Sequence, residues 1–436
     1  MNFTVSLKNY KNIIWFVVVI YCLELFVLQP QSFFLLELGA IVLLMANSRR
    51  IIIPRIAGLK PYLLYILFIS IVGLAKFGLT LTQRDLFYQL GSIVTIVLGY
   101  YLYILYDDKG KSLWSTLCFI LLIASIVCLA KGVFSLTSDI EFSDLRNSFG
   151  LAIKSISVLL PLLVGKRLFL KEKSMPWVFD YVAIILWTVQ IVLNMSRIAI
   201  VNIGISSAIF FIVMIVKKGF NAAAIVKIII FAILMSAAVV AIQSYLPDEA
   251  TDKFGNKVDN MISEVGVNNE YSTIGEAQSD WRGYENSQAV KQWKKEDPIT
   301  QIFGAGNGRI ISIEFIPDSW KETVERQGNI IGVTILHNTY YTLLIKGGIV
   351  LVALLLLFLA MNLKVAINLI RDRRYIFEGI VLLSIVIYIL VDGYVIRTMI
   401  ERGEEIAPML LLGYYNALYY RTKDTEGEED EKSEED

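Results

Sequence analysis

A single histidine offers the clearest basis for acid–base chemistry in this chain of 436 residues. His337 stands where a hydrophilic stretch meets an apolar one, and Asn338-Thr-Tyr-Tyr341 follows it directly. Histidine is the side chain whose ordinary pKa, ~6.5, suits proton abstraction near neutral pH. The alternative interpretation is an interfacial polar residue without a chemical role. Because the chain has one histidine, every metal site that needs two is excluded.

Arginines beside the same hydrophilic stretch, or in short loops between apolar runs, form a second candidate set. The set consists of Arg146, Arg197, Arg282 and Arg309. A guanidinium presents a planar fork of donors that fits two phosphate oxygens at once, so this set predicts an anionic, phosphate-like ligand. Arg309 has an alternative as a solvated residue or as the partner of a carboxylate such as Glu285.

Two lysines lie inside apolar runs, where a charge is costly and usually faces a cavity or a partner. Lys154 and Lys346 could line the same anion-binding cavity as the arginines. Glu24 and Glu37 are the alternative, as structural counter-ions of these lysines.

No motif in the chain predicts a metal, a cofactor or a nucleic acid. Cys22, Cys118 and Cys128 lie inside apolar runs, where a thiol behaves as a small hydrophobe, so we expect no disulfide and no cysteine-based zinc site. The turn Gly304-Ala-Gly-Asn-Gly308 lacks the third glycine of a dinucleotide fingerprint and the Lys-Ser/Thr of a P-loop. We therefore expect no cofactor.

The elements that must position these side chains are membrane helices. Hydrophobic residues make up 56% of the chain and charged residues 18%, with a mean hydropathy of +0.60. Runs such as 12–28, 86–105 and 198–216 are too long and too numerous to hide from water in one soluble core, so a bilayer must act as solvent. The sequence predicts an all-α, polytopic membrane protein.

About 20 mostly apolar residues are needed to span a bilayer as a helix, and this length predicts about twelve spans. They lie at 12–28, 32–46, 61–75, 86–105, 113–131, 147–164, 178–193, 198–216, 222–243, 338–360, 376–392 and 405–420. The predicted organisation is nine spans in 1–243, one large extracytoplasmic loop domain in 244–336, three spans in 337–422, and an acidic, disordered cytoplasmic tail in 423–436.

Basic residues predict the orientation of these spans. Lys and Arg concentrate in one set of alternate short loops, including 47–60, 165–176 and 361–375. The opposite short loops contain only Lys76, Arg84, Arg146, Arg197, Arg397 and Arg402. The positive-inside rule then places both termini in the cytoplasm and the 244–336 loop outside.

Inside the loop, the pattern predicts a helix from Trp281 to about Lys295. Asp280 is a suitable N-cap, Pro298 stops the helix, and Ala289 shares one face with the tryptophans at 281 and 293. A glycine-rich turn follows at 304–308.

Four short patterns, taken in order, resemble the bacterial O-antigen ligase and polymerase family. They are Arg146-Asn-Ser-Phe-Gly150, Asn194-Met-Ser-Arg197, Arg282-x10-Trp293-x4-Pro298-x5-Gly304-x-Gly306, and His337-Asn338-x8-Gly347-Gly348. The resemblance covers about residues 146–350 and rests on the order of the patterns and the long loop together. One departure is Ile198-Ala199 after Arg197, where such proteins often have Gly-Ala.

The resemblance implies transfer of a glycan from an undecaprenyl-diphosphate carrier to an acceptor hydroxyl, at the outer face of the bacterial inner membrane and without a metal. In that scheme His337 takes the hydroxyl proton and direct displacement inverts the anomeric centre. Arg282 acts with it, stabilising charge on the diphosphate. The expected diphosphate-binding residues are Arg197, Arg146, Arg309, Lys154 and Lys346.

The acceptor would be a saccharide or a lipid-anchored glycan, and a polysaccharide chain-length regulator is a further expected partner. Polymerase and ligase differ only in that acceptor, and the polymerase is slightly favoured because it needs no second lipid.

Two other classes stay open at this point. A transporter of lipid-linked saccharide or of a small anion also suits twelve spans with intramembrane lysines. A receptor or scaffold whose loop binds polysaccharide would bind without turnover.

Overall fold

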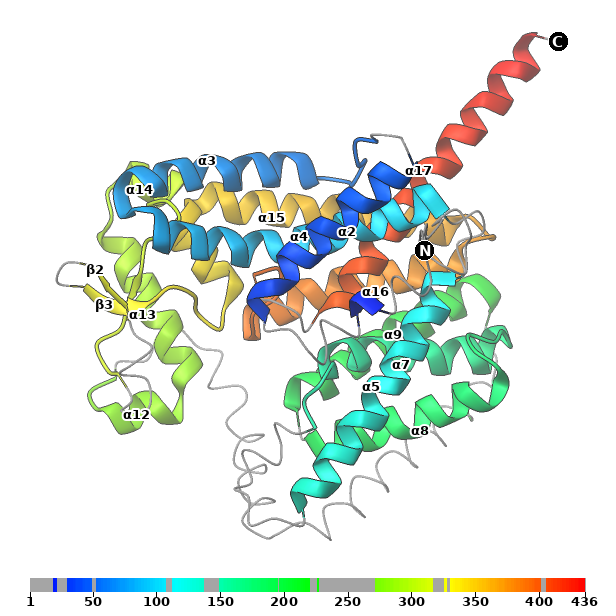
Figure 1. The fold of residues 1–436 in the computed structure, drawn as a ribbon, viewed down its shortest axis with the longest axis horizontal. Helices are drawn as coiled ribbons and strands as arrows, with labels where there is room; N and C mark the ends of the chain where they lie inside the picture. Colours follow the sequence, from blue (N-terminus) through cyan, green and yellow to red (C-terminus); the bar gives the residue numbers. More distant parts are fainter. Residues whose placement is uncertain are drawn as a thin grey trace, which may run out of the picture.

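The computed structural model describes residues 19–21, 30–48, 52–106, 112–136, 149–194, 196–219, 226, 271–316, 325–327, 330–400 and 405–435. Long helices dominate this part of the chain (Figure 1). They are α2 (Pro30–Ser48), α3 (Leu59–Phe77), α4 (Leu79–Tyr106), α5 (Ser112–Leu136), α7 (Ile153–Gly165) with the π-turn η1 (Lys166–Leu170), α8 (Trp177–Asn194), α9 (Arg197–Lys218), α15 (Thr339–Arg371), α16 (Ile376–Val395) and α17 (Ile406–Glu435).

Among the described residues, 7 helices are long and apolar enough to cross a membrane. They are Leu59–Phe77, Leu79–Leu105, Leu113–Gly132, Trp177–Asn194, Arg197–Lys218, Thr339–Arg371 and Ile376–Val395. This confirms the predicted class, an all-α polytopic membrane protein. The expected spans 12–28 and 222–243 lie almost wholly outside the described residues, so the number twelve remains a prediction.

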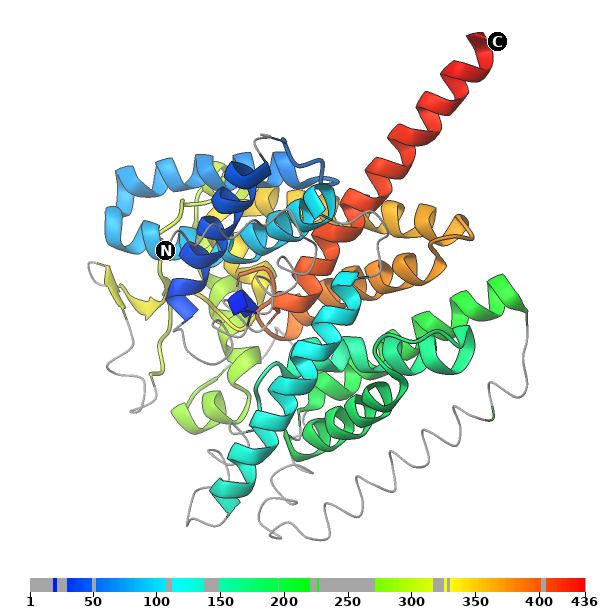
Figure 2. The same cartoon turned by 45° about the vertical axis from the view of Figure 1, so that its right-hand side comes forward.

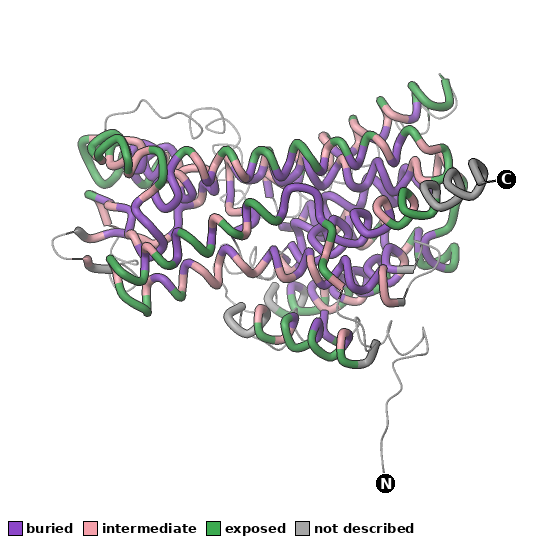
Figure 3. The backbone as a smooth tube through the Cα atoms, turned by 90° about the horizontal axis from the view of Figure 1, so that it is seen from above, coloured by how far each residue is buried: buried purple, intermediate pink, exposed green. Residues whose placement is uncertain are grey.

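The helices form two groups that meet along α16 and α9. In one group α3, α4 and α15 run side by side, with α2 and α17 packed on α4 (Figure 1). In the other, α5, α7, α8 and α9 pack together, and both views keep this group apart from α3 (Figure 2). Buried positions face inward and exposed positions follow the outer faces of the helices (Figure 3).

Small residues allow α4 and α17 to pack closely. A Cβ on Gly99 would lie 2.0 Å from the carbonyl oxygen of Leu410, and a Cβ on Gly413 would lie 1.8 Å from that of Ile96. Close backbone approach through glycine is a common way to associate helices in lipid, where apolar burial alone gives little driving force. The C-terminal helix is thereby fixed to the α3–α4–α15 group.

The described part of the hydrophilic loop forms a small mixed layer at one end of α3, α4 and α15, which we call the loop end (Figure 1). It contains α12 (Ile274–Ser279), α13 (Trp281–Lys295), α14 (Pro298–Phe303), and strands β1 (Ile311–Ser312), β2 (Glu325–Gln327) and β3 (Ile330–Val333). The strands pair antiparallel in the order β1-β3-β2. This sheet was not predicted from the sequence, because strands of 2 to 4 residues are too short to show an alternating pattern.

Helix α13 confirms the prediction made from its capping signals. It runs from Trp281 to Lys295, and the Asp280 side chain accepts a hydrogen bond from the backbone N–H of Gly283. Pro298 does not continue it but begins α14, where Asp297 is the N-cap. Hydrogen bonds from Thr300 lower the pKa of Asp297, so this cap stays charged near neutral pH.

The acidic tail differs from the prediction. We expected 423–436 to be disordered, whereas α17 continues as a helix to Glu435 and extends beyond the other helices (Figures 1 and 2). Glu and Lys are good helix formers, and extending a helix that has already begun avoids the unfavourable nucleation step. The expectation of disorder had treated the tail as separate from the apolar helix that precedes it.

Candidate active site at the start of α15

His337 precedes α15 and is held by a carboxylate from the loop helix α13. Its Nδ1 lies 2.9 Å from Oε2 of Glu285, and its backbone N–H donates to the same oxygen at 2.9 Å. The side chain of Glu285 is 1% exposed and that of His337 is 32% exposed. A carboxylate oxygen accepts, so the contact assigns the proton to Nδ1 and an acceptor lone pair to Nε2. The arrangement can take a proton from a hydroxyl.

Packing of α13 against α15 fixes the position of Glu285. The indole N–H of Trp281, four residues earlier, donates to the other oxygen of Glu285 at 2.9 Å. Ala289 of the same helix is buried with Leu336 and Ile345 in an apolar cluster between α13 and α15. The Glu285–His337 pair therefore sits beside a packed apolar contact, and neither carboxylate oxygen lacks a donor.

Two of the predicted arginines lie at this end of the molecule. Arg282 is half-buried on α13, three residues before Glu285, a spacing that places both on one helix face. Arg197 begins α9. Five residues later, Asn202 donates to Asp392 near the end of α16 at 3.0 Å, so Arg197 stands about 7.5 Å further toward the loop end.

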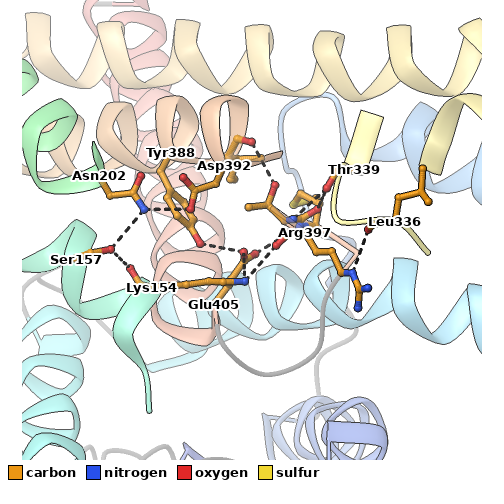
Figure 4. Close-up of polar contacts among 12 residues, drawn as sticks. Lys154, Ser157, Asn202, Leu336, Thr339, Tyr388, Asp392, Arg397 and Glu405 are labelled. Carbon is orange, nitrogen blue, oxygen red and sulfur yellow. Dashed lines mark hydrogen bonds and ion pairs between the residues drawn. The ribbon is translucent and has the colours of Figure 1, made fainter. Parts of the chain in front are cut away.

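Lys154 is buried in α7 and is held by groups of the chain. Its ammonium donates to the backbone carbonyl of Arg397 at 3.2 Å and lies 3.7 Å from a carboxylate oxygen of Glu405 (Figure 4). Glu405 also accepts from the hydroxyl of Tyr388 at 2.9 Å. The counter-ion of Lys154 is thus Glu405. Glu37, the expected alternative, accepts from the hydroxyl of Thr95 instead, and Glu24 lies outside the described residues.

Lys346 forms a second buried ion pair, with Asp85 of α4. The exposed fractions of the two side chains are 1% and 0%, and the ammonium also donates to the carbonyl of Arg309 at 3.1 Å. The backbone N–H of Gly308 donates to the same carboxylate oxygen of Asp85 at 2.6 Å. This lysine joins three segments of the chain, and we leave it out of the substrate-binding set.

The glycine-rich turn 304–308 has a structural role, because it supplies hydrogen-bond donors to a break in α15. At Gly348 the backbone leaves the helical conformation (φ 63°, ψ −166°), which interrupts α15. The carbonyls of Ile345 and Lys346 instead accept hydrogen bonds from the N–H groups of Ala305 and Gly306, at 3.2 and 2.9 Å. A break in a membrane helix is tolerated where other donors satisfy the freed carbonyls.

Asn307 anchors the other side of this turn. It is fully buried, and its side chain exchanges hydrogen bonds with Gln89 of α4 and donates to Ser70 of α3. Its backbone N–H donates to the carbonyl of Ile69 at 3.0 Å. The turn therefore ties α3, α4 and α15 together at the loop end.

Arg309 belongs to this second region. Its guanidinium pairs with Glu296 at 2.7 Å, not with Glu285, the partner suggested by the sequence. The two glutamates are 11 positions apart along α13 and its C-cap, or about 16 Å. The structure therefore does not bring Arg309 or Lys346 together with His337, and Arg146 lies outside the described residues.

Two residues of the site were not predicted from the sequence. Glu285 appeared only as a possible partner of Arg309, and Arg397 only in the charge count. The spacing Arg282-x2-Glu285 on a capped helix is the one local signal for Glu285. Its contact with His337 joins positions 52 residues apart, which no local pattern reveals. Within the described residues, no group of three His, Cys, Asp or Glu side chains is placed to hold a metal ion.

The chain is thus a multi-pass helical membrane protein with a carboxylate–histidine pair at one end of its bundle. Residues 182–356 match the sequence model of the family described as O-antigen ligase. Comparison with curated proteins finds no match. Over this segment the match bears out the resemblance to the O-antigen ligase and polymerase family that the sequence patterns predicted. The matched segment includes Arg197, Arg282, Glu285 and His337, whereas Arg397 lies beyond it.

Proposed function

We propose that this chain transfers a glycan from undecaprenyl diphosphate to a saccharide hydroxyl at the outer face of the inner membrane. The acceptor oxygen forms a bond to the anomeric carbon of the donor while the bond from that carbon to the diphosphate breaks. The diphosphate leaves with the electron pair, and the hydroxyl proton passes to Nε2 of His337. Direct displacement inverts the anomeric centre, and no covalent intermediate with the enzyme is required.

The observation that supports this proposal best is the contact between His337 and buried Glu285. The carboxylate fixes the imidazole ring and stabilises the imidazolium that forms when the proton arrives. Since His337 is partly exposed and Glu285 is not, the substrate meets the base and not its carboxylate partner.

Arg282 and Arg197 are the proposed diphosphate-binding residues. Each is half-buried at the loop end, where the head of a lipid-linked donor would lie while its apolar chain stays among the helices. Guanidinium groups stabilise the charge that grows on the leaving diphosphate. Arg146 remains a candidate from the sequence. We expect no metal to be needed, so excess EDTA should leave the transfer rate unchanged.

The test is in vitro transfer by the purified chain in detergent, with lipid-linked donor and saccharide acceptor. His337→Ala should lower the rate roughly 10²- to 10⁴-fold, the usual contribution of a general base, without loss of folded protein. Arg282→Lys keeps the charge but loses the bidentate fork, so we expect weaker transfer. Lys291→Met, on the exposed face of the same helix, is the control. Normal transfer by His337→Ala would remove the base assignment.

A transporter of lipid-linked saccharide is the second candidate, and buried ion pairs such as Lys346–Asp85 are the feature that favours it. The detergent assay separates the two classes, because bond transfer needs no sealed membrane whereas transport does. The assay also distinguishes a polymerase, which extends a repeat-unit chain, from a ligase, which requires a lipid-anchored acceptor.

A further inference from the structure

Arg397 contacts the main chain directly before the proposed base. Its Nε–H donates to the carbonyl of Leu336 at 3.0 Å and its Nη2 group donates to the carbonyl of Ile335 at 3.4 Å. These are the last two carbonyls before His337. Figure 4 shows the guanidinium at Leu336, turned away from the polar cluster around Lys154 and Glu405.

The charge of Arg397 is not neutralised by its partners in the described part of the chain. Both acceptors are uncharged carbonyls, and no described carboxylate pairs with this guanidinium, in contrast to Arg309 and Arg374. A guanidinium has five N–H donors, and the hydrogen bonds to Leu336 and Ile335 use two of them. A half-buried cation with donors to spare is a binding group for an anion.

Buried polar groups fix the backbone around Arg397 from several sides. Lys154 donates to its carbonyl. The hydroxyl of Thr339 donates to the carbonyl of Thr398 at 2.8 Å and accepts from its N–H at 3.0 Å. The N–H of Met399 donates to Glu405 at 3.4 Å.

This framework gives Lys154 a role different from the one expected from sequence. The ammonium positions the segment that carries Arg397 instead of contacting the substrate itself. A guanidinium held in place before the substrate arrives loses little freedom when it binds, which is the condition for strong charge stabilisation.

We propose that Arg397 binds a phosphate oxygen next to His337, and that this oxygen belongs to the diphosphate of the lipid-linked donor. The inference rests on the proposed function and adds a residue from outside the matched family segment. Its guanidinium would hold the leaving diphosphate near the base and stabilise the charge that the diphosphate gains as the sugar bond breaks.

Binding of undecaprenyl diphosphate to the purified chain tests this assignment, because binding can be measured without transfer. Arg397→Gln should weaken binding about 10- to 100-fold, the loss expected for a hydrogen bond to a charged group. Arg397→Lys should weaken it less. Arg374→Gln, which removes an exposed arginine between α15 and α16, is the matched control and should bind as the wild type does.

A second arm uses phosphatidylglycerol, because an anionic lipid headgroup offers the same phosphate chemistry. If Arg397→Gln loses affinity for phosphatidylglycerol alone, Arg397 is a lipid contact and the donor assignment is wrong. Equal affinity of Arg397→Gln and wild type for undecaprenyl diphosphate, with equal thermal stability, would also overturn it. Should Arg397→Gln fail to fold, Arg397→Lys takes its place, and unchanged affinity in that folded variant overturns the proposal. If the wild type itself neither binds nor transfers, the proposed function fails first.

Discussion

At the residue scale, the buried carboxylate of Glu285 explains how one histidine can serve as a base at a membrane boundary. The same oxygen accepts from the backbone and from the ring of His337, so the ring has one orientation relative to its own main chain. An exposed, unheld imidazole would rotate and spend little time aimed at a substrate hydroxyl. Orientation, not burial of the histidine, is therefore the contribution of α13.

Replacing Glu285 by Gln tests this orientation effect. The amide has nearly the same shape but lacks the charge that stabilises the imidazolium, so kcat should fall about 10- to 100-fold, less than in His337→Ala. Because Glu285 does not touch the diphosphate in our scheme, the KM for donor should stay close to the wild-type value. An unchanged kcat, measured in the detergent assay, would show that Glu285 has only a structural role.

The pair Lys346–Asp85 allows a separate prediction about stability. Asp85→Asn leaves a buried ammonium without its carboxylate and should destabilise the protein by about 3–5 kcal/mol. The double variant Asp85→Leu/Lys346→Met removes both charges and should recover much of that loss. Thermal unfolding of the purified variants measures the difference. If the double variant is less stable than Asp85→Asn, the two side chains stabilise the fold by more than neutralising each other's charge.

At the element scale, the interruption of α15 is the feature that joins the loop to the membrane helices. Gly348 has φ 63°, and a Cβ there would lie 2.3 Å from the carbonyl oxygen of Ile302. Glycine is required here for two reasons. The positive φ is unfavourable for any residue with a Cβ, and an added Cβ would collide with the carbonyl of Ile302.

Gly348→Ala should therefore displace α14 from α15 and lower the yield of folded protein sharply. The control is Gly39→Ala in α2, where an added Cβ meets nothing within 4 Å and alanine should be neutral or slightly stabilising in a helix. Size-exclusion profiles and thermal unfolding of both variants provide the measurement. Wild-type behaviour of Gly348→Ala would show that the turn adapts and that the break is not required.

Helix α13 shows which features of an element can be predicted from sequence. Its two ends and its cap follow from Asp280, Pro298 and an apolar face, all of which are local signals. The contact between Glu285 of α13 and His337 could not be predicted, because the two residues are 52 positions apart in the sequence. The same holds for Lys346 and Asp85, which are 261 positions apart. Local chemistry identified the charged residues, and only the fold reveals how they pair.

At the scale of the whole molecule, the C-terminal helix contributes to the bundle through its first half. Gly413 packs on α4, Asn416 donates to the side chain of Asn362 at 2.7 Å, and Asp424 pairs with Arg55 at 3.0 Å. Both residues of that last pair are largely exposed, and such surface pairs contribute little to stability. The helix beyond Asp424 extends past the other helices (Figure 2).

Two truncations should accordingly behave differently. A chain that ends at Thr425 keeps the packed part of α17 and should retain wild-type stability and transfer. A chain that ends at Leu412 loses the packing of Gly413 on α4 and the contact of Asn416 with Asn362, so it should not accumulate in the membrane. Immunoblots of membrane fractions compare the two. Instability of the longer chain would assign a structural function to the acidic end.

At the interruption of α15, hydrogen bonds from the glycine-rich turn replace hydrogen bonds within the helix. This replacement has a consequence for the order in which the segments are synthesised and inserted into the membrane. The ribosome makes the donors at Ala305 and Gly306 some forty residues before the carbonyls that receive them. When the translocon releases α15, the two N–H donors of the turn have already been synthesised. The freed carbonyls of α15 can therefore be hydrogen-bonded as soon as the helix enters the lipid. Reversing that order, for example by circular permutation between α14 and α15, would leave the nascent helix exposed to quality-control proteolysis.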